Sequence, residues 1–578
     1  MKKYLFKNWW RYLVGGFSLI ASTAIDLAVP LVVMSLIDVV IVGKDVSALP
    51  RHLVLLGGAA VGRAIFQYVK EYLCDMAGCN VAEDLRKDLM AHLLKLSKSF
   101  FDANNTGELM ARVKDDAGRV WDLFGFVGML MTEAILYFIG VVICMVRLNW
   151  KLSLIPLVFI PFMAWRVLDL KKKLDETYGQ ISEENATLTR VIEENIVGVR
   201  TVKAFSAEEF ELQKFDEQNA RYNDINIEQA MDMAKAEPVI GTIPKVMQAA
   251  VIVVGGIAAI KGNITYGVLV AFMQYAANIV WPIENMGWML ACISAGVTGV
   301  KKINKIFRAV PEIAESDTPV ILDNKNGTLS FNNVGFTLNN HEILKNVSFT
   351  LEKGKTLGIM GATGTGKSTI VNLIERYYDV TEGSISIDGI DIKEMCLDEL
   401  RGFSSVVMQD VFLFSDTIKE NVKLGQKSTL DDTDVRHAIR KAHAQEFVEK
   451  ITGGYDAVIG ERGIGLSGGQ KQRLSIARAL ARKSKVLILD DSTSALDMET
   501  ESDIQREIRE KKDMSKIIIG HRISSVKDAD EIIVLDNGTI AERGTHRELL
   551  GKRGLYFKTY EAQYGSLAEA LKIEGGEA

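Results

Sequence analysis

The chain has 578 residues, about four times the length of an average domain, so one compact soluble unit is not expected. Its 68 basic and 74 acidic side chains give a net charge of −6, whereas proteins whose main partner is nucleic acid usually carry a basic excess. Charged residues make up 25% of the chain, yet the mean hydropathy is +0.10, which is high for that much charge. The composition therefore predicts two unlike halves, one embedded in a membrane and one soluble.

The five cysteines are an odd number scattered over the whole length, a pattern that suits neither a disulfide framework nor a zinc site. Buried or lipid-facing thiols are the simpler interpretation. These residues are Cys74, Cys79, Cys144, Cys292 and Cys396.

Long apolar stretches recur through the first ~310 residues and predict six membrane spans, because a spanning helix needs about 20 mostly apolar residues. The fourth stretch is the shortest and its ends are the least well defined. The six stretches cover residues 13–41, 53–69, 123–146, 152–165, 239–260 and 264–300.

Positive residues before the first span place the N-terminus in the cytoplasm, namely Lys2, Lys3, Lys7 and Arg11. A secretory signal is the less favoured alternative, because the apolar run continues past Asp26 and a second span follows. Six spans return the chain to the cytoplasm, so the second half is expected there.

The connections at residues 71–121 and 166–237 are long, highly charged and almost free of proline. We expect them to extend the spans into the cytoplasm as helical hairpins. Two separate cytoplasmic domains are a weaker alternative, because neither connection has a strand pattern.

From about Pro311 short strand-like runs alternate with helices and glycine turns, which is typical of an α/β domain. The predicted fold is therefore an α-helical six-span transmembrane domain at residues 1–310, followed by an α/β P-loop nucleotide-binding domain at residues 311–578.

Residues 361–369, of sequence GATGTGKST, match the pattern G-x-x-x-x-G-K-[ST] between an apolar strand (356–360) and a helix (369–378). The glycines let backbone N–H groups turn toward a polyphosphate, and the helix N-terminus adds partial positive charge. Lys367 reaches the β- and γ-phosphates, and Ser368 offers its hydroxyl to Mg²⁺. The pattern, a Walker A motif, predicts a nucleotide and Mg²⁺ site at Gly361, Ala362, Thr363, Gly364, Thr365, Gly366, Lys367, Ser368 and Thr369.

Asp490 follows the apolar run 486–489 and lies 123 positions after Lys367. This arrangement is typical of a Walker B strand, whose terminal aspartate supports Mg²⁺. Any core strand can end in aspartate, so the prediction rests on its pairing with the Walker A motif.

Between the two Walker motifs lies the sequence LSGGQ, made of Leu466, Ser467, Gly468, Gly469 and Gln470. With this signature the chain resembles the ATP-binding-cassette (ABC) proteins. Six spans followed by one cassette resemble a half-transporter of the exporter type, and the resemblance covers nearly the whole chain.

The resemblance implies that two cassettes meet head to tail and hold each ATP between the Walker motifs of one chain and the signature of the other. It also implies that Gln409 is the Q-loop residue, which contacts Mg²⁺ and senses the membrane domain. His521 is then the switch histidine at the γ-phosphate; a lone histidine is more often structural, but its place just past the strand 516–519 favours this role. The D-loop comprises Ser494, Ala495, Leu496 and Asp497.

This chain departs from the family's pattern at Asp491, where competent cassettes usually have a glutamate that acts as general base or positions water. Aspartate is one methylene shorter, so its carboxylate stands about 1 Å from the productive place, and such misplacement can cost about 10²-fold in rate. A conservative change tolerated in a slower homodimer is the alternative.

A second departure is Leu338, at the position where the family usually has an aromatic residue that stacks on adenine. Leucine can pack on the ring but loses stacking worth about 1–3 kcal/mol in other base-binding sites. Phe336 is not a substitute, because strand alternation points it into the core.

Both departures affect this chain's own ATP site, whereas the signature that serves the partner's ATP is intact. That asymmetry resembles the degenerate-site subunit of a heterodimeric bacterial multidrug-type exporter, whose partner carries the glutamate. The alternatives are a homodimeric lipid or drug exporter with slow hydrolysis and a nucleotide-gated regulator that does not pump.

The cytoplasmic connections also resemble those of exporters. Residues 100–115 resemble the first coupling-helix region, and residues 198–208 resemble the stretch just after the second one. Such short helices are expected to dock on the cassettes.

Charged residues inside the spans tend to face cavities, because charge is costly in lipid. Glu284, near Trp281 and Trp288, is a candidate contact for cationic amphiphiles, although salt bridges between chains or snorkelling to the membrane interface explain such charges at least as well. A drug, lipid or peptide cargo stays open. The charged span residues are Asp26, Asp38, Arg63, Glu133, Lys245 and Glu284.

Overall fold

The computed structural model describes residues 1–315, 320, 327–424, 426 and 429–565. Contacts divide the chain into two compact units. The first comprises residues 1–95 and 104–310, and the second comprises residues 96–103 and 311–578.

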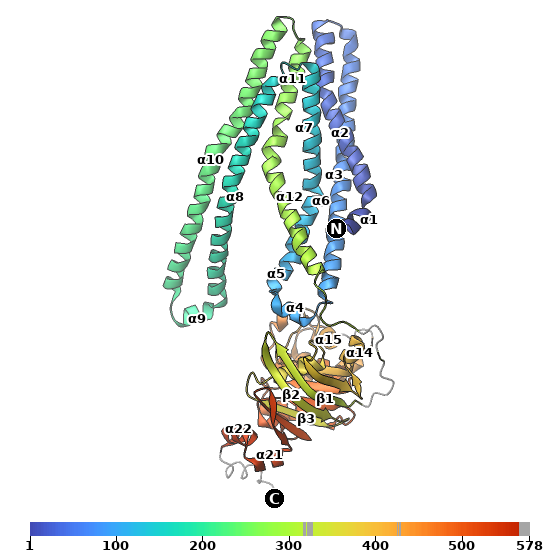
Figure 1. The fold of residues 1–578 in the computed structure, drawn as a ribbon, viewed down its shortest axis with the longest axis vertical. Coiled ribbons are helices and arrows are strands. Elements are labelled where there is room, and N and C mark those ends of the chain that lie inside the picture. The colour runs from blue at the N-terminus through green and yellow to red at the C-terminus, as the bar shows by residue number, and fades with distance from the viewer. Residues whose placement is uncertain (316–319, 321–326, 425, 427–428, 566–578) are drawn as a thin grey trace. The chain divides into compact units, whose positions relative to one another are not determined.

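The described part of the first unit is helical, and its long helices lie side by side (Figure 1). They are α2 (Trp9–Leu36), α3 (Leu49–Leu93), α7 (Phe126–Leu148), α8 (Leu154–Val197), α10 (Glu208–Ile260), α11 (Tyr266–Asn278) and α12 (Val280–Phe307). Shorter segments join them: α1 (Lys2–Lys7), η1 (Ile37–Val42), η2 (Val46–Ala48), α5 (Thr106–Ala111), η3 (Arg112–Asp116), α6 (Ala117–Phe124) and α9 (Val199–Ala204).

Five helical stretches of the described residues are long and apolar enough to cross a membrane: 9–42, 46–93, 106–148, 208–260 and 266–307. The sixth expected span lies at the start of α8. Its uncharged part ends at Trp165, where charged residues follow, so it is shorter than the others. A helical transmembrane domain is confirmed, while the count of six rests on this short segment.

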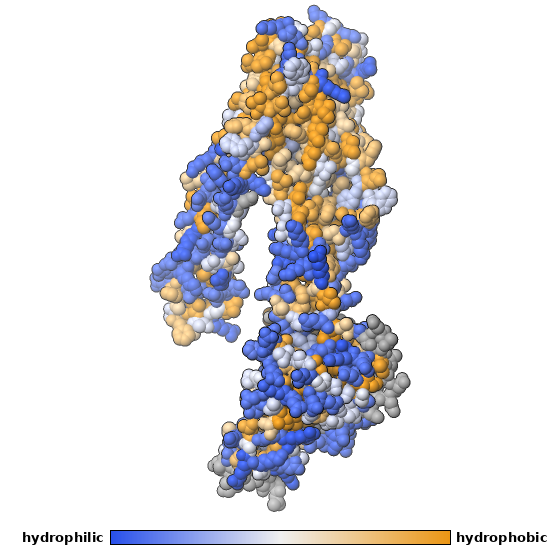
Figure 2. Space-filling view, viewed as in Figure 1, coloured by the Kyte–Doolittle hydropathy of each residue, from blue (hydrophilic) through white to orange (hydrophobic). Residues whose placement is uncertain are grey.

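The second long connection is a continuation of the helices, as expected: α8 and α10 run side by side and are joined by α9 (Figure 1). Figure 2 shows mostly hydrophilic residues along the half of this hairpin that leads to α9 and mostly hydrophobic residues over the opposite half of the helical unit. At the α9 end itself Val197 and Phe205 are exposed. The first connection continues α3 to Leu93 and then breaks into short helices.

The second unit contains two sheets. A four-stranded antiparallel sheet has the order β2-β1-β4-β5, and a six-stranded sheet has the order β10-β9-β3-β8-β7-β6. In the larger sheet β6, β7, β8, β3 and β9 are parallel, and β10 is antiparallel to β9. The strands are β1 (Leu329–Leu338), β2 (His341–Leu351), β3 (Thr356–Gly361), β4 (Glu382–Ile387), β5 (Ile390–Asp391), β6 (Ser404–Val407), β7 (Val486–Asp490), β8 (Ser515–Ile519), β9 (Glu531–Asp536) and β10 (Thr539–Gly544).

The central strands are continuous apolar runs because helices and the second sheet cover both of their faces. β3 and β7, for example, have buried residues at nearly every position. The helices of this unit are α4 (Lys98–Ala103), α13 (Lys367–Ile374), α14 (Leu397–Phe403), α15 (Ile418–Val422), α16 (Asp432–Lys441), α17 (Gln445–Lys450), α18 (Gly468–Ala481), α19 (Met498–Glu510), α20 (Ile523–Val526), α21 (His546–Lys552) and α22 (Leu555–Tyr564), with short 3₁₀ turns at Gly454–Asp456 and Glu461–Gly463.

The strand order places β3 beside β8 and β8 beside β7, so the carboxyl ends of three parallel strands meet at one edge. Ligands of parallel α/β sheets bind outside such carboxyl ends. The α/β nucleotide-binding fold predicted for this half is confirmed.

Candidate functional site

The predicted phosphate-binding loop connects β3, which ends at Gly361, to α13, which begins at Lys367. Gly366 caps α13 with φ +95°, and a Cβ atom built there lies 2.6 Å from Cδ2 of Leu344. A side chain at this position is therefore excluded both by the backbone conformation and by the close neighbour. The glycine turns the chain so that the loop amides and the N-terminus of α13 face the same space.

Lys367 is held against its own loop. Its Nζ donates hydrogen bonds to the carbonyl oxygens of Gly361 at 2.9 Å and Ala362 at 2.7 Å. Burial lowers the pKa of its ammonium group, and the charges of Asp490 and Asp491 oppose that shift. The ammonium is thus fixed beside two carboxylates.

Asp490, the last residue of β7, is buried and accepts a hydrogen bond from the Ser368 side chain. Burial raises the pKa of this carboxyl; the hydrogen bond and the charge of Lys367 act against the rise, whereas Asp491 adds to it. Two oxygen-bearing side chains from different elements therefore meet at one point. Oxygen ligands are those that Mg²⁺ prefers.

A cleft of about 350 Å³ gathers these elements. Gln409 enters it from just after β6, Asp490 and Asp491 from the end of β7, and His521 from just after β8. Three lining residues, Ile343, Ile519 and Gly520, were not predicted from the sequence. Ile343 could not be predicted, because only the fold brings β2 to this edge. The lining comprises Ile343, Thr363, Gly364, Gly366, Lys367, Ser368, Thr369, Gln409, Asp490, Asp491, Ile519, Gly520 and His521.

Three predicted loop residues support the cleft without lining it. Gly361 and Ala362 provide the carbonyl groups that hold Lys367, and the hydroxyl of Thr365 donates to the carbonyl oxygen of Ala362 at 2.9 Å. These contacts fix the shape of the loop.

Asp491 has a left-handed backbone, with φ +45°. Its amide donates to the carbonyl oxygen of Ile519 at 2.9 Å, and its own carbonyl accepts from the Ser494 hydroxyl at 3.1 Å. Aspartate and asparagine adopt this conformation more readily than other non-glycine residues. With both backbone groups held, the reach of this carboxylate depends on its side chain alone.

Leu338 ends β1, where it pairs with His341, and packs partly buried against the core. It does not line the cleft, so its predicted contact with adenine stays a prediction. Phe336 is 4% exposed, and its ring centroid lies 5.5 Å from that of Tyr378. The prediction that Phe336 points into the core is confirmed.

The signature residues lie outside the cleft, at the start of α18. Ser467 caps this helix in a reciprocal arrangement: the Gln470 amide donates to the Ser467 hydroxyl at 3.3 Å, and the Ser467 amide donates to the Gln470 side-chain oxygen at 2.9 Å. Ser467 and Gly468 are exposed, and Leu466 and Gly469 are partly buried. The helix N-terminus is therefore ordered and accessible.

The D-loop is fastened to the signature helix. Gln472 of α18 donates to the Ser494 hydroxyl at 3.3 Å and accepts from the Ala495 amide at 3.0 Å. Leu496 is buried in the helical core beside α18. Asp497 caps α19 by accepting from the Thr500 amide at 3.0 Å.

Glu501 joins the D-loop to the loop that carries His521, and sequence analysis did not identify it. This buried carboxylate accepts hydrogen bonds from the hydroxyls of Thr493 at 2.8 Å and Ser525 at 3.0 Å. Arg522 donates to the carbonyl oxygen of Ser494 at 3.1 Å and to Glu501 at 3.5 Å. Nothing in the sequence around Glu501 distinguishes it from an ordinary helix-surface glutamate.

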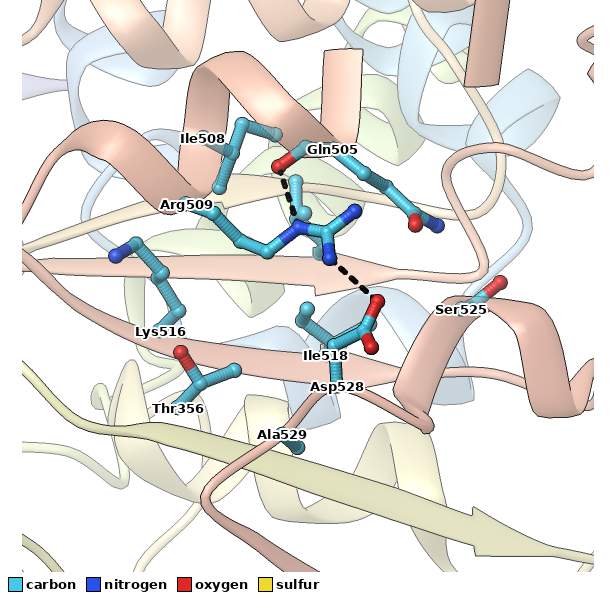
Figure 3. A pocket seen from close by; sticks show the side chains of 10 residues that line it. Thr356, Gln505, Ile508, Arg509, Lys516, Ile518, Ser525, Asp528 and Ala529 are labelled. Atoms are coloured by element: carbon cyan, nitrogen blue, oxygen red, sulfur yellow. Dashed lines mark hydrogen bonds and ion pairs between the residues drawn. The ribbon is translucent and has the colours of Figure 1, made fainter. Parts of the chain in front are cut away.

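A much smaller cavity of about 20 Å³ lies beside α19, β8 and α20 (Figure 3). Arg509 bridges its rim by donating to the Gln505 carbonyl and pairing with Asp528. Burial lowers the pKa of Lys516, whose Nζ donates to the Lys511 carbonyl oxygen at 2.9 Å. The space holds about one water molecule, so it is too small for a nucleotide.

Part of the first coupling-helix region, α4, packs on the nucleotide unit. Nζ of Lys98 lies 3.4 Å from the side-chain oxygen of Asn372 and 5.8 Å from the ring centroid of Tyr378. Asp102 accepts a hydrogen bond from the Tyr378 hydroxyl, and Ser99 donates to Glu312 at 2.6 Å. This segment is therefore part of the second compact unit.

Asp26, Arg63 and Glu133 line a cavity of about 780 Å³ within the helical unit, and each of them belongs to an ion pair. Nε of Arg63 is 2.7 Å from Oδ1 of Asp26, and Nζ of Lys70 donates to both carboxylate oxygens of Glu133 at 2.8 Å. These charges from the spans therefore pair within the chain.

The other charged span residues differ among themselves. Asp38 accepts from the Thr265 hydroxyl at 2.6 Å and from the Gly267 amide at 2.8 Å, so it fastens the start of α11. Lys245 and Glu284 are exposed in this chain.

Residues 12–283 match the ABC transporter transmembrane region, and residues 344–494 match the ABC transporter family. The chain is 33% identical over 582 residues to a probable multidrug resistance ABC transporter ATP-binding/permease protein, YheI, of Bacillus subtilis, covering 99% of this chain and 98% of the relative. It is 31% identical over 559 residues to an ATP-dependent lipid A-core flippase of Syntrophus aciditrophicus, covering 96% and 92%. A solved structure of a bacterial Atm1-family ABC exporter with ATP bound is similar with a TM-score of 0.81 and 26% identity, covering 97% and 99%.

Proposed function

The chain belongs to the ABC transporter family, and from this premise we propose that it is one subunit of a heterodimeric exporter, binding ATP in a degenerate site. ATP-driven export is supported by its relatives, which include a probable multidrug transporter and a lipid flippase. Residues 1–310 form the transmembrane domain and residues 311–578 form the nucleotide-binding domain. One observation carries the proposal: the cleft contains the Walker residues with Asp491, whereas the intact signature does not line the cleft and is exposed at Ser467 and Gly468.

The cleft residues suit ATP and Mg²⁺. Lys367 and the loop amides bind the β- and γ-phosphates, and His521 lies at the γ-phosphate. Ser368, Gln409 and Asp490 provide oxygen ligands for Mg²⁺, and the hydrogen bond between Ser368 and Asp490 supports this assignment. When bound, Mg²⁺ neutralises charge that develops on the phosphates.

The signature serves the nucleotide of a second chain. Ser467 and Gly468 are exposed at the N-terminus of α18, where free amides and the helix dipole favour a γ-phosphate. Since neither residue lines this chain's own cleft, one chain alone leaves each ATP site incomplete.

Asp491 makes this chain's own site slow. Its amide and carbonyl are held by Ile519 and Ser494, so the missing methylene is not recovered by a backbone shift. The partner therefore has a glutamate at the corresponding position. In a homodimer both sites would be slow together.

The protein lies in the cytoplasmic membrane of a bacterium with its N-terminus and cassette in the cytoplasm. We place amphiphilic small molecules, lipids or peptides as its cargo, because the spans line a cavity with both charged residues (Asp26, Arg63 and Glu133) and aromatic residues, including Tyr137 and Trp281.

The test is to purify the tagged chain from its native membrane in mild detergent and to identify every chain in the dimer-sized fraction by mass spectrometry. We expect a second ABC half-transporter with glutamate after its Walker B aspartate. A fraction that contains this chain alone would contradict the heterodimer proposal and would favour the slow homodimer. Export of a dye from vesicles that hold both chains then separates a pump from a regulator.

A further inference from the structure

The last described helix, α22, is firmly packed on the nucleotide unit. Tyr556 and Tyr560 are 1% and 2% exposed, and they share a core with Ile523 and Val526 of α20. Figure 1 shows α22 beside α21, far along the chain from the Walker motifs. Its packing fixes the place of the residues that follow on the same face.

Gln563, three residues after Tyr560, holds the backbone on both sides of Arg522. Its side-chain Nε2 donates to the carbonyl oxygen of His521 at 2.7 Å, and its Oε1 accepts from the Ile523 amide at 2.9 Å. A carboxamide carries a donor and an acceptor side by side, so one side chain satisfies both backbone groups.

The backbone at this point needs such a partner. Residues 520–522 lie between β8 and α20, outside both elements. Ile523 is the first residue of α20, and a first-turn amide has no acceptor within its own helix. Gln563 provides that acceptor and, through the second hydrogen bond, fixes the carbonyl of the residue whose ring enters the cleft.

The opposite side of the same loop is held by Arg522, which bonds to Ser494 in the D-loop and to the buried Glu501. The loop that carries His521 is thus fixed between the D-loop and the C-terminal helix. A shift of α22 would move His521 relative to the cleft.

We propose that Gln563 is a positioning residue for His521, so that the C-terminal helix sets how well this chain's cleft distinguishes ATP from ADP. This inference rests on the proposed function, which places His521 at the γ-phosphate. Gln563 itself does not line the cleft and acts only through the loop.

The first measurement is amide hydrogen exchange of the full chain in detergent, without nucleotide. In Gln563→Ala the Ile523 amide loses its acceptor, and we expect its exchange to quicken roughly 3- to 10-fold, the factor that one hydrogen bond provides. Gln563→Glu keeps the acceptor but loses the donor, so Ile523 stays protected. Glu561→Ala, an exposed position on the same helix, is the matched control and leaves exchange unchanged.

The second measurement is the affinity of the same variants and of His521→Ala for ADP and for a non-hydrolysable ATP analogue, with Mg²⁺. We expect Gln563→Ala and Gln563→Glu to bind the analogue roughly 3- to 10-fold more weakly. Their affinity for ADP should stay within about twofold of the unaltered chain, and their thermal unfolding temperature should stay within about one degree. His521→Ala should show the same loss, and Glu561→Ala none.

The two measurements separate the possible failures. If His521→Ala weakens the analogue but neither Gln563 variant does, the positioning role of Gln563 is overturned. If His521→Ala has no effect, the proposed place of His521 is wrong, and the functional part of the inference is overturned with it. Faster exchange of the Ile523 amide in Gln563→Ala would then show that the two hydrogen bonds of Gln563 are purely structural.

Discussion

The cleft and the signature surface, which is formed by residues 466–470, share one structural feature: each contains a glycine-containing segment at the start of a helix. At the cleft, Gly366 opens α13, and Lys367, Asp490 and His521 surround the helix N-terminus. At the signature, Ser467 opens α18 with no such surroundings: its partner is Gln470 of the same turn, and Ser467 and Gly468 are exposed. A helix N-terminus attracts an anion in either place, but only the cleft has groups that select a nucleotide. The signature therefore depends on groups from another chain, and substitutions on the two surfaces should act on different ATP molecules.

The largest expected effect comes from Gly468→Asp in the complex with the partner. A carboxylate on this exposed turn repels the partner's γ-phosphate, and its Cβ meets only Ala495 at an ordinary 3.5 Å, so folding is not disturbed. We expect ATP hydrolysis by the complex to fall about 100-fold or more, comparable to the loss of a group that binds the transition state. Asp491→Asn on the other surface should change hydrolysis less than about twofold. Equal losses from both substitutions would contradict the division of labour between the two surfaces.

Lys367→Ala tests the cleft surface by nucleotide binding. The ammonium makes charge-assisted hydrogen bonds to phosphate oxygens, so ATP affinity should fall about 10- to 100-fold. The measurement is titration of the purified chain with a fluorescent ATP analogue and Mg²⁺. Lys355→Ala is the matched control, because Lys355 is an exposed lysine whose Nζ pairs with Asp530 at 3.0 Å. Similar affinities in the two variants would show that the cleft is not the nucleotide site.

Gly366→Ala and Gly364→Ala separate shape from backbone freedom in the loop. Both glycines have positive φ, but a Cβ at Gly366 lies 2.6 Å from Leu344 whereas one at Gly364 meets nothing within 4 Å. Each alanine costs about 1–2 kcal/mol of conformational energy, and the clash adds to this only at Gly366. We expect lower thermal stability and weaker ATP binding for Gly366→Ala than for Gly364→Ala. The reverse order would mean that α13 does not open against β2 as described.

Leu338→Tyr should give the smallest effect, a gain. An aromatic ring that stacks on adenine adds about 1–3 kcal/mol in other base-binding sites. The affinity for ATP should therefore rise about fivefold or more. Unchanged affinity would show that Leu338, which ends β1 outside the cleft lining, does not face the base.

The groups at the carboxyl ends of β3, β6, β7 and β8 could be anticipated because each stands within a few residues of a recognisable strand. Strands of a parallel sheet bring such positions to one edge, where Lys367 and Asp490 meet Gln409 and His521, two residues that were expected there from the resemblance to ABC proteins. Glu501 and Gln563 could not be anticipated, because their hydrogen bonds join elements far apart in the chain and each looks like an ordinary surface residue. The fourth span was uncertain for a related reason: its apolar run is short, and only the continuous helix α8 shows where it leads.

We propose that this chain's own ATP site is slow because Asp491 is one methylene too short, and the decisive measurement is ATP hydrolysis by the purified chain without its partner. The chain, Asp491→Glu and Asp491→Asn are compared at saturating ATP and Mg²⁺, with two copies placed in each lipid nanodisc so that the signature of each copy completes the ATP site of the other. We expect background hydrolysis for the chain and for Asp491→Asn, and a rise of about tenfold or more for Asp491→Glu. Robust hydrolysis by the unaltered chain that Asp491→Asn abolishes would contradict it.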